Sequence, residues 1–260
     1  MNMSELLKKL ETYADSDYLP MHMPGHKRRM GDLGNPFFID ITEIDGFDDL
    51  HHAEGILKQA EERAAELYGS EETHYLVNGS TSGILAAISG CTAAGGTVLL
   101  ARNSHKSAYH AGLLRGLHVH YIYPQPAGKM GINGPVTAEN VDRLLEEHPE
   151  TKMVYITSPT YDGVVSDVEQ IAEVVHRRKL PLIVDEAHGA HFPFSEQFPK
   201  DSVSCGADVV IHSVHKTLPS LTQTALIHLN GDLINREKIR YFLGVYQSSS
   251  PSYVMMAGID

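Results

Sequence analysis

Two short apolar segments, each followed by a charged side chain, constrain the fold of this chain most strongly. Residues 182–184 are Leu-Ile-Val and lead into Asp185, while residues 209–211 are Val-Val-Ile and lead through a short polar stretch to Lys216. Short β-branched segments without polar residues are typical of parallel strands buried on both faces. Open sheets of this kind bind their ligands at the carboxyl ends of the strands. The sequence therefore predicts that Asp185 and Lys216 meet at one edge of a parallel sheet.

Strand and helix patterns alternate from about residue 70 to residue 230. This alternation predicts an α/β fold with a doubly wound, mainly parallel sheet flanked by helices. The expected strands are 73–77, 97–100, 119–123, 153–157, 181–184, 209–213 and 224–229, the last as an antiparallel or edge strand. The expected helices include 54–68, 84–91 after a turn at 78–83, one that Thr137 caps, one that Asp167 and Gln170 open as a capping box, and 235–243.

The chain divides by pattern into two parts. Residues 1–52 are predicted to form an N-terminal helix and an extended arm, and residues 53–260 a large domain that is incomplete at its C-terminus. The helix pattern at 3–14 places Leu6, Leu7 and Leu10 on one face. Prolines and glycines then interrupt the pattern up to residue 52, as in a functional loop or an arm. Composition leaves open whether the histidines of this arm serve a site.

Composition excludes several classes of protein. The chain has 21 basic and 33 acidic side chains, so its net charge of −12 argues against a nucleic-acid-binding surface. No apolar run approaches the ~20 residues that cross a bilayer, and the N-terminus lacks a signal-peptide pattern. Cys91 and Cys205 form no disulfide or metal pattern. We therefore expect a cytoplasmic protein that binds neither nucleic acid nor membrane.

A carboxylate and a lysine at neighbouring strand ends suit the cofactor pyridoxal 5'-phosphate. The amine of Lys216 would form a Schiff base with it, and Asp185 would keep the pyridine nitrogen protonated so that the ring accepts electrons. The competing interpretations are a surface position for Lys216 and an arginine or metal partner for Asp185.

Polar groups also follow two other predicted strands. The Gly-Ser-Thr turn after residue 77 offers backbone N–H groups and the hydroxyls of Ser80 and Thr81 to a phosphate. Taken alone it also fits an ordinary helix start, and it lacks the Walker A lysine and the dinucleotide-binding glycine spacing. His105 follows the next strand, where it suits either stacking on a planar cofactor or a loop hydrogen bond. Ser213 and His215 flank the lysine and can reach the same phosphate.

Sixteen histidines raise the question of a metal ion. Asp185, Glu186, His188 and His191 are close enough in sequence to bind zinc or iron together. However, the sequence contains no cysteine cluster and no H-E-x-x-H motif, and a metal ion at Asp185 leaves the lysine without a role. We therefore expect no metal site.

Several motifs stand in an order that resembles a known family. They are Pro-Met-His-Met-Pro-Gly-His-Lys at 20–27, Asn-Gly-Ser-Thr at 78–81, Ser-His-Lys-Ser at 104–107, Asp-Glu-Ala-His-Gly-Ala-His at 185–191, Ser-Val-His-Lys-Thr at 213–217, Thr-Gln-Thr at 222–224 and Gln-Ser-Ser-Ser-Pro-Ser-Tyr at 247–253. Together they resemble the Orn/Lys/Arg decarboxylase family of fold-type I, aspartate-aminotransferase-like enzymes that use pyridoxal phosphate. The resemblance covers nearly the whole chain.

The resemblance implies a pyridoxal-phosphate-dependent decarboxylase that converts arginine, lysine or ornithine to the corresponding amine, as a homodimer or higher homo-oligomer. It implies the following roles: Lys216 as the Schiff-base lysine, Asp185 at the pyridine nitrogen, His105 stacked on the ring, Ala187 on the opposite ring face, His188 near the reacting carbon, and Ser80, Thr81, Ser213 and His215 around the phosphate.

The resemblance also leaves alternatives open. Family members continue into a small C-terminal domain that this sequence lacks, so the choice of basic amino acid and the activity of this chain are not determined. The segments 18–27 and 248–253 are implied to serve a neighbouring subunit. Another fold-type I lyase or aminotransferase would share the cofactor site. A truncated, non-catalytic homologue with an interaction or regulatory role is the third interpretation, motivated by the apolar residues 254–257 near the end of the sequence.

Overall fold

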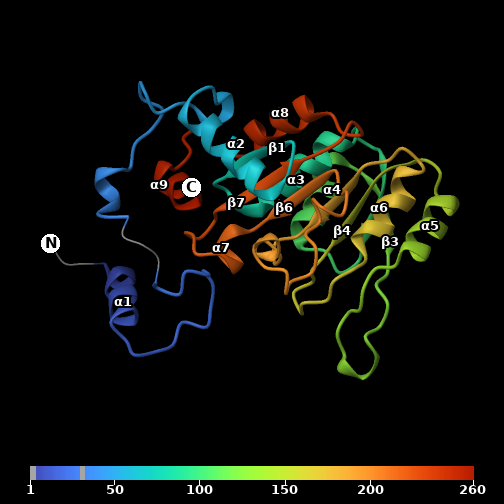
Figure 1. The fold of residues 1–260 in the computed structure, drawn as a ribbon, viewed down its shortest axis with the longest axis horizontal. Coiled ribbons are helices and arrows are strands. Elements are labelled where there is room, and N and C mark those ends of the chain that lie inside the picture. Colours follow the sequence, from blue (N-terminus) through green and yellow to red (C-terminus); the bar gives the residue numbers. More distant parts are fainter. Residues whose placement is uncertain (1–3, 30–32) are drawn as a thin grey trace.

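A seven-stranded sheet forms the centre of the molecule (Figure 1), which a computed structural model describes for residues 4–29 and 33–260. The strands are β1 (Glu72–Leu76), β2 (Thr97–Ala101), β3 (His118–Ile122), β4 (Thr151–Thr157), β5 (Leu182–Asp185), β6 (Val209–His212) and β7 (Ala225–Leu229). Their spatial order is β1-β7-β6-β5-β4-β2-β3, with parallel pairing from β3 to β6 and antiparallel pairing of β7 with both β6 and β1. The predicted doubly wound, mainly parallel sheet is confirmed.

Helices cover both faces of this sheet. The longer ones are α1 (Glu5–Ala14), α2 (Ile56–Tyr68), α3 (Gly79–Cys91), α4 (Lys106–Arg115), α5 (Ala138–Glu147), α6 (Val168–His176) and α8 (Arg236–Tyr246), and two short ones are α7 (Val214–Thr217) and α9 (Tyr253–Ile259). One apolar core lies between the sheet and α3, α4 and α8, and a second lies between the sheet and α5 and α6. No helix in the part of the chain that the structure describes is long and apolar enough to cross a membrane.

Strand β7 is antiparallel, as expected, but it is not an edge strand. It lies between β6 and β1, and all five of its residues are buried. Four of its five side chains are apolar and lie on both faces of the sheet, so burying them requires a position inside the sheet.

Helix α3 begins at Gly79, so the predicted turn at 78–83 is wrong in its extent. Glycine and serine have low helix propensity, which is why the sequence pattern suggested a turn there. Packing overrides this propensity, because a side-chain Cβ on Gly83 would come 2.6 Å from Leu76 Cδ1. Only a glycine lets the helix approach β1 so closely, and the hydroxyl residues of the expected turn become the first turn of α3.

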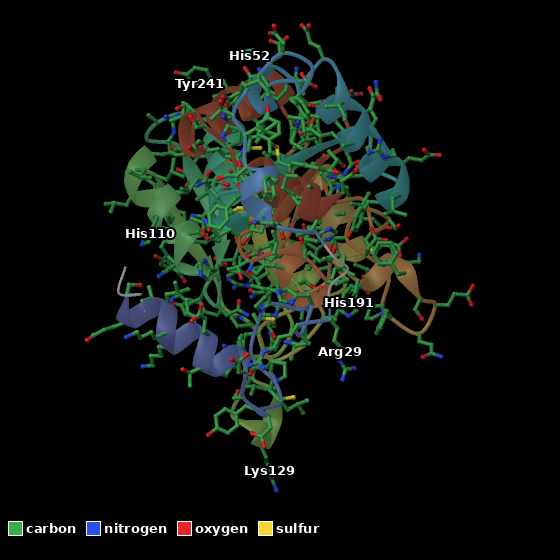
Figure 2. The ribbon with its side chains drawn as sticks, turned by 90° about the vertical axis from the view of Figure 1, so that its left-hand side faces the viewer. Arg29, His52, His110, Lys129, His191 and Tyr241 are labelled. Carbon is green, nitrogen blue, oxygen red and sulfur yellow. The ribbon has the colours of Figure 1, made fainter. Side chains whose placement is uncertain are left out.

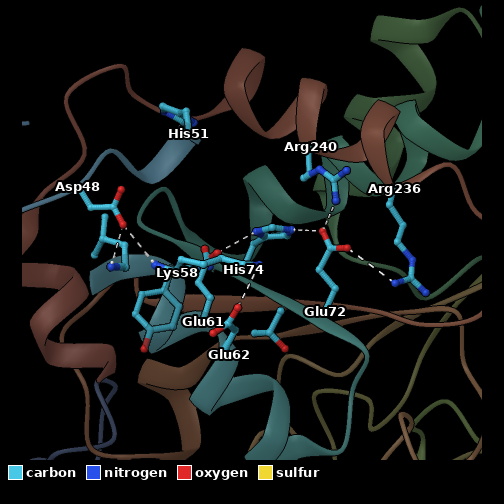
Figure 3. A network of polar contacts seen from close by, with 12 residues as sticks. Asp48, His51, Lys58, Glu61, Glu62, Glu72, His74, Arg236 and Arg240 are labelled. Carbon is cyan, nitrogen blue, oxygen red and sulfur yellow. Dashed lines mark hydrogen bonds and ion pairs between the residues drawn. The ribbon is translucent and has the colours of Figure 1, made fainter. Parts of the chain in front are cut away.

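A partly buried polar network joins α2, β1 and α8 (Figure 3). His74 of β1 contacts Glu61 of α2 at 3.2 Å and Glu72 at 2.6 Å, and Glu72 also accepts a hydrogen bond of 2.6 Å from Arg240 of α8. Burial disfavours a charge on His74, but the two carboxylates outweigh it and raise the pKa of His74 to about 9. Asp48 completes this region by accepting the Gly55 N–H at the start of α2 at 2.7 Å.

Two segments extend from the body of the protein. Helix α1 stands apart from the sheet, and its predicted apolar stripe is exposed, with Leu6 at 69% and Leu10 at 56%. The connection between β3 and α5 projects with Lys129 at its tip (Figure 2). The division of the chain at residue 52 stays a prediction, and residues 1–3 and 30–32 of its first part lie outside the described residues.

Two helical glycines are expected to respond oppositely to replacement by alanine. In Gly90→Ala the new Cβ would press against Ile239 Cγ1 and lie 3.0 Å from the Ile239 Cα, so we expect a loss of about 1–3 kcal/mol where α3 crosses α8. In Gly244→Ala the nearest atom is His51 Nδ1 at 3.9 Å, so the usual gain of about 0.5–1 kcal/mol should appear. Urea unfolding measures both changes. Equal effects of the two substitutions would contradict the close α3–α8 packing.

Candidate active site

The carboxyl ends of β4, β5 and β6 meet at one edge of the sheet. The register pairs Asp185 with Thr157 of β4 on one side and with Ile211 of β6 on the other. A cavity of about 410 Å³ opens at this edge. Its lining residues are Met21, His22, Met23, Ser80, Asn103, Ser104, His105, Thr157, Tyr161, Asp185, Ala187, His188 and Lys216. Segments from six parts of the sequence therefore converge on one site.

Lys216 lies in the short helix α7 directly after β6, and its amine reaches the cavity. Its Nζ is 3.0 Å from His188 Nε2. Burial lowers the pKa of Lys216, and the Asp185 carboxylate offsets this only in part. Burial and then the nearby Lys216 charge lower the pKa of His188 to about 4. His188 is therefore neutral at physiological pH and accepts a hydrogen bond from the lysine amine.

Asp185 is a buried carboxylate with an exposed fraction of only 2%. Oδ1 accepts the Ala187 N–H at 3.1 Å, and Oδ2 accepts the Tyr155 hydroxyl at 3.1 Å. Burial raises the pKa of Asp185 despite these donors and the charge of Lys216. A cation beside this carboxylate would offset the cost of its burial.

A pair of hydroxyl groups lies at the start of α3. Ser213 Oγ donates a hydrogen bond of 2.9 Å to Ser80 Oγ, which joins the end of β6 to the first turn of this helix. The first N–H groups of a helix have no acceptor inside it and lie at the positive end of its dipole. The hydroxyls and the helix start together offer donors to an anion. Thr81 is exposed beside them, and His215 is held by a 2.8 Å contact of Nδ1 with the Thr224 carbonyl oxygen.

His105 caps α4 and presents an exposed side chain to the cavity. Its Nδ1 accepts the Ser107 N–H at 3.3 Å and contacts Ser107 Oγ at 2.8 Å, so the ring is held by one edge. Partial burial of the ring lowers the pKa of His105, which favours the neutral imidazole. Of the nine residues predicted for the site, six line the cavity, namely Ser80, His105, Asp185, Ala187, His188 and Lys216, whereas Thr81, Ser213 and His215 do not.

The N-terminal arm closes one side of the cavity of its own chain. Met21, His22 and Met23 line it, and the Gly25 N–H donates a hydrogen bond of 2.6 Å to the His215 carbonyl oxygen. A Cβ on Gly25 would come 2.5 Å from the Leu218 carbonyl oxygen, so only glycine permits this approach to α7. His22 of this histidine-rich segment therefore lies at the cavity, whereas the implied role of residues 18–27 in a neighbouring subunit stays a prediction.

Sequence reasoning missed several residues of the site. Asn103 and Thr157 follow β2 and end β4, so the rule that strand ends carry function could have found them. Tyr161 also lines the cavity, from an exposed position in the loop that follows β4. Tyr155 lies inside a strand and looks like an ordinary core residue, and its hydroxyl contact with Asp185 becomes visible only in three dimensions.

The four side chains of the alternative metal site at 185–191 do not lie close enough together to share an ion. Glu186 bonds instead with Ser202 and His212, and His191 packs against Phe198. Among residues 4–29 and 33–260, the only group of histidine, cysteine and acidic side chains close enough to share an ion is His120, His148 and Glu150, and none of these lines the cavity.

Comparison with known proteins places this chain in a family. The family model for the Orn/Lys/Arg decarboxylase major domain matches residues 4–260. The chain belongs to the Orn/Lys/Arg decarboxylase family.

Two proteins of Bacillus subtilis (strain 168) are similar to nearly the whole chain. The uncharacterised protein YaaO is 41% identical over 98% of this chain and 55% of its own length. An arginine decarboxylase is 34% identical over 96% of this chain and 53% of its own length. The chain therefore spans about half the length of these curated relatives.

Two solved structures of lysine decarboxylases share the fold. The lysine decarboxylase LdcF of Francisella novicida matches with a TM-score of 0.75 and 23% identity, over 98% of this chain and 39% of that one. Lysine decarboxylase A of Pseudomonas aeruginosa matches with a TM-score of 0.74 and 24% identity, over 96% of this chain and 38% of that one.

We expect His188 to titrate near pH 4, because burial and Lys216 disfavour its charged form. The unfolded chain binds this proton near pH 6.5, so this group lowers the free energy of unfolding as the pH falls from about 6.5 towards 4. Histidine-selective NMR titration, with His188→Asn to assign the signal, measures the pKa directly. A midpoint near 6.5 would contradict the contact between His188 and the lysine amine.

Proposed function

We propose that this chain forms the cofactor-binding large domain of a pyridoxal-phosphate-dependent decarboxylase that acts on arginine, lysine or ornithine. The observation that carries the proposal is the amine of Lys216 at the same cavity as the buried carboxylate of Asp185. The names of relatives support it, since the 34% identical protein is an arginine decarboxylase and a 25% identical one is a lysine decarboxylase.

The side chains around the cavity fit the chemistry of pyridoxal phosphate. Asp185 would hold the pyridine nitrogen in its protonated, cationic form. A cationic partner is what a carboxylate as buried as Asp185 favours. Ser80, Thr81, Ser213 and His215 would hold the phosphate at the start of α3. His105 and Ala187 would lie on the two faces of the ring. When bound, the cofactor supplies a conjugated ring that accepts the electron pair released as carbon dioxide leaves.

Two residues, His188 and Tyr155, prepare the nucleophile and the carboxylate. His188 Nε2 lies 3.0 Å from Lys216 Nζ and orients the amine. Burial favours the neutral, nucleophilic form of the Lys216 amine. The Tyr155 hydroxyl orients Asp185 from inside the sheet. His188 also lies where it can hold or accept a proton beside the substrate, since its ring is neutral above about pH 4.

We further propose that the protein works in the cytoplasm as a homodimer or larger homo-oligomer. Both cysteines are free, as is usual in a reducing compartment. The exposed stripe of Leu6, Leu7 and Leu10 on α1 is a surface that a second copy can cover. Light scattering of the purified chain tests the assembly, and a monomer at micromolar concentration would contradict it.

The cofactor assignment is tested by adding pyridoxal phosphate to the purified chain and recording its visible absorption. We expect a band from covalent attachment in the wild type and in Lys200→Ala, and no such band in Lys216→Ala. Lys200 is a matched control because it is exposed and forms an ion pair with Glu169 at 3.5 Å. Loss of the band in the control as well, or its persistence in Lys216→Ala, would contradict the assignment.

The reaction is tested by measuring carbon dioxide and amine formed from arginine, lysine and ornithine in turn. We expect Asp185→Asn to keep the cofactor but to lower turnover by about a hundredfold or more, because a neutral amide cannot stabilise the charge on the pyridine nitrogen. Formation of a keto acid without carbon dioxide would indicate an aminotransferase. A cofactor band without any turnover would contradict the activity of this chain and favour the non-catalytic interpretation.

A further inference from the structure

A line of buried polar side chains crosses four neighbouring strands, behind the candidate active site. Glu186 follows β5, His212 ends β6, His228 lies in β7 and Thr73 lies in β1. None of the four exposes more than 2% of its surface. None lines the cavity, so the proposed reaction leaves them without a role. Polar groups buried so deeply are costly unless each has a hydrogen-bond partner.

Each neighbour in this line is within hydrogen-bond distance of the next. Glu186 Oε2 is 2.7 Å from His212 Nε2, and His212 Nδ1 is 3.0 Å from His228 Nε2. His228 Nδ1 is 2.8 Å from Thr73 Oγ1, which is 2.7 Å from the hydroxyl of the half-buried Ser70. The line therefore runs without a break from the turn after β5 to the rim of the sheet.

The Glu186 carboxylate at one end of the line fixes which atoms donate and which accept along it. A carboxylate only accepts hydrogen bonds, so Nε2 of His212 has to donate. If His212 is neutral, its Nδ1 accepts, and Nε2 of His228 then donates in turn. We propose that Ser70, Thr73, His228, His212 and Glu186 form one directed relay of hydrogen bonds, in which both imidazoles are neutral and carry their hydrogen on Nε2.

The surroundings favour neutral imidazoles. Glu186 already accepts the Ser202 N–H at 3.1 Å and the Ser202 hydroxyl at 2.8 Å, so three donors stabilise its charge without a cation. Burial lowers the pKa of His228 well below its ordinary range, and the charge on the nearby His74 acts in the same direction. The Tyr68 ring lies 4.9 Å and 4.7 Å from the two imidazoles and closes them off on one side.

The relay makes Glu186 a positioning residue for the active-site turn. The Gly189 N–H donates a hydrogen bond of 2.8 Å to the Glu186 carbonyl oxygen, and a Cβ on Gly189 would come 2.5 Å from Glu186 Cγ. The turn thus packs directly on the side chain that the relay holds. It carries Ala187 and His188 into the cavity. The effect of Glu186 on catalysis rests on the proposed function, whereas the relay of hydrogen bonds does not depend on that function.

The substitution Glu186→Gln gives the sharpest test. Oε1 of Glu186 accepts two hydrogen bonds from Ser202, so the amide oxygen should stay there and the NH2 group should face His212. An NH2 group cannot accept, so Nε2 of His212 has to become the acceptor. Both imidazoles should then move their hydrogen to Nδ1, with Thr73 accepting from His228. Nitrogen NMR of histidine-labelled protein reads this inversion directly.

Two controls separate the relay from general effects of substitution. Glu61→Gln alters another buried glutamate that contacts a histidine, in the separate network of Figure 3. Ser202→Ala removes a donor to Glu186 but leaves its carboxylate in place. Both variants should keep His212 and His228 with hydrogen on Nε2. A doubly protonated His212, hydrogen on Nδ1 of His228 in the wild type, or unchanged tautomers in Glu186→Gln would overturn the relay.

The positioning role has its own measurement. In Glu186→Gln the charge-assisted hydrogen bonds of the carboxylate become weaker neutral ones, so the turn should loosen. The titration of His188 should then rise from about pH 4 towards 6.5, while Glu61→Gln leaves it in place. Inverted tautomers with an unchanged His188 titration would uphold the relay and overturn the positioning role. Neither measurement uses the cofactor, so failure here is distinct from failure of the proposed function.

Discussion

The common register of β4, β5 and β6 is the constraint on which the candidate site depends. Parallel strands end at the same edge of a sheet, so Asp185 is enclosed between β4 and β6 with 2% of its surface exposed. Its carboxylate is tolerated there because Tyr155 and the Ala187 N–H donate to it. The lysine that follows β6 reaches the same cavity, since the next strand ends at the same edge.

The turn after β5 connects two chemically different regions. Successive side chains at a strand end point to opposite sides, so Asp185 reaches the cavity while Glu186 reaches the buried histidines of β6 and β7. The next residues, Ala187 and His188, return to the cavity. One short stretch of chain therefore contributes both to the hydrogen bonds inside the sheet and to the geometry of the candidate site.

Much of the fold followed from the sequence pattern, and the exceptions have physical reasons. The short apolar runs identified buried parallel strands because few other elements tolerate them. The predicted start of α3 was wrong because packing against Leu76 outweighs the low helix propensity of the glycines and serines in this helix. The apolar stripe of α1 was read correctly as one helix face, but a hydrophobic pattern does not tell what covers it, and Leu6 is 69% exposed.

By itself, the sequence determined which chemical groups stand at the strand ends: an aspartate, a lysine, a histidine and a pair of hydroxyl residues. It did so because strand boundaries are visible as sharp changes from apolar to polar residues. Only the tertiary structure decided which atoms meet. Ser80 and Ser213, Tyr155 and Asp185, and the arm with α7 come from distant parts of the chain. Their contacts depend on strand order and on distances of a few ångström, which no local pattern encodes.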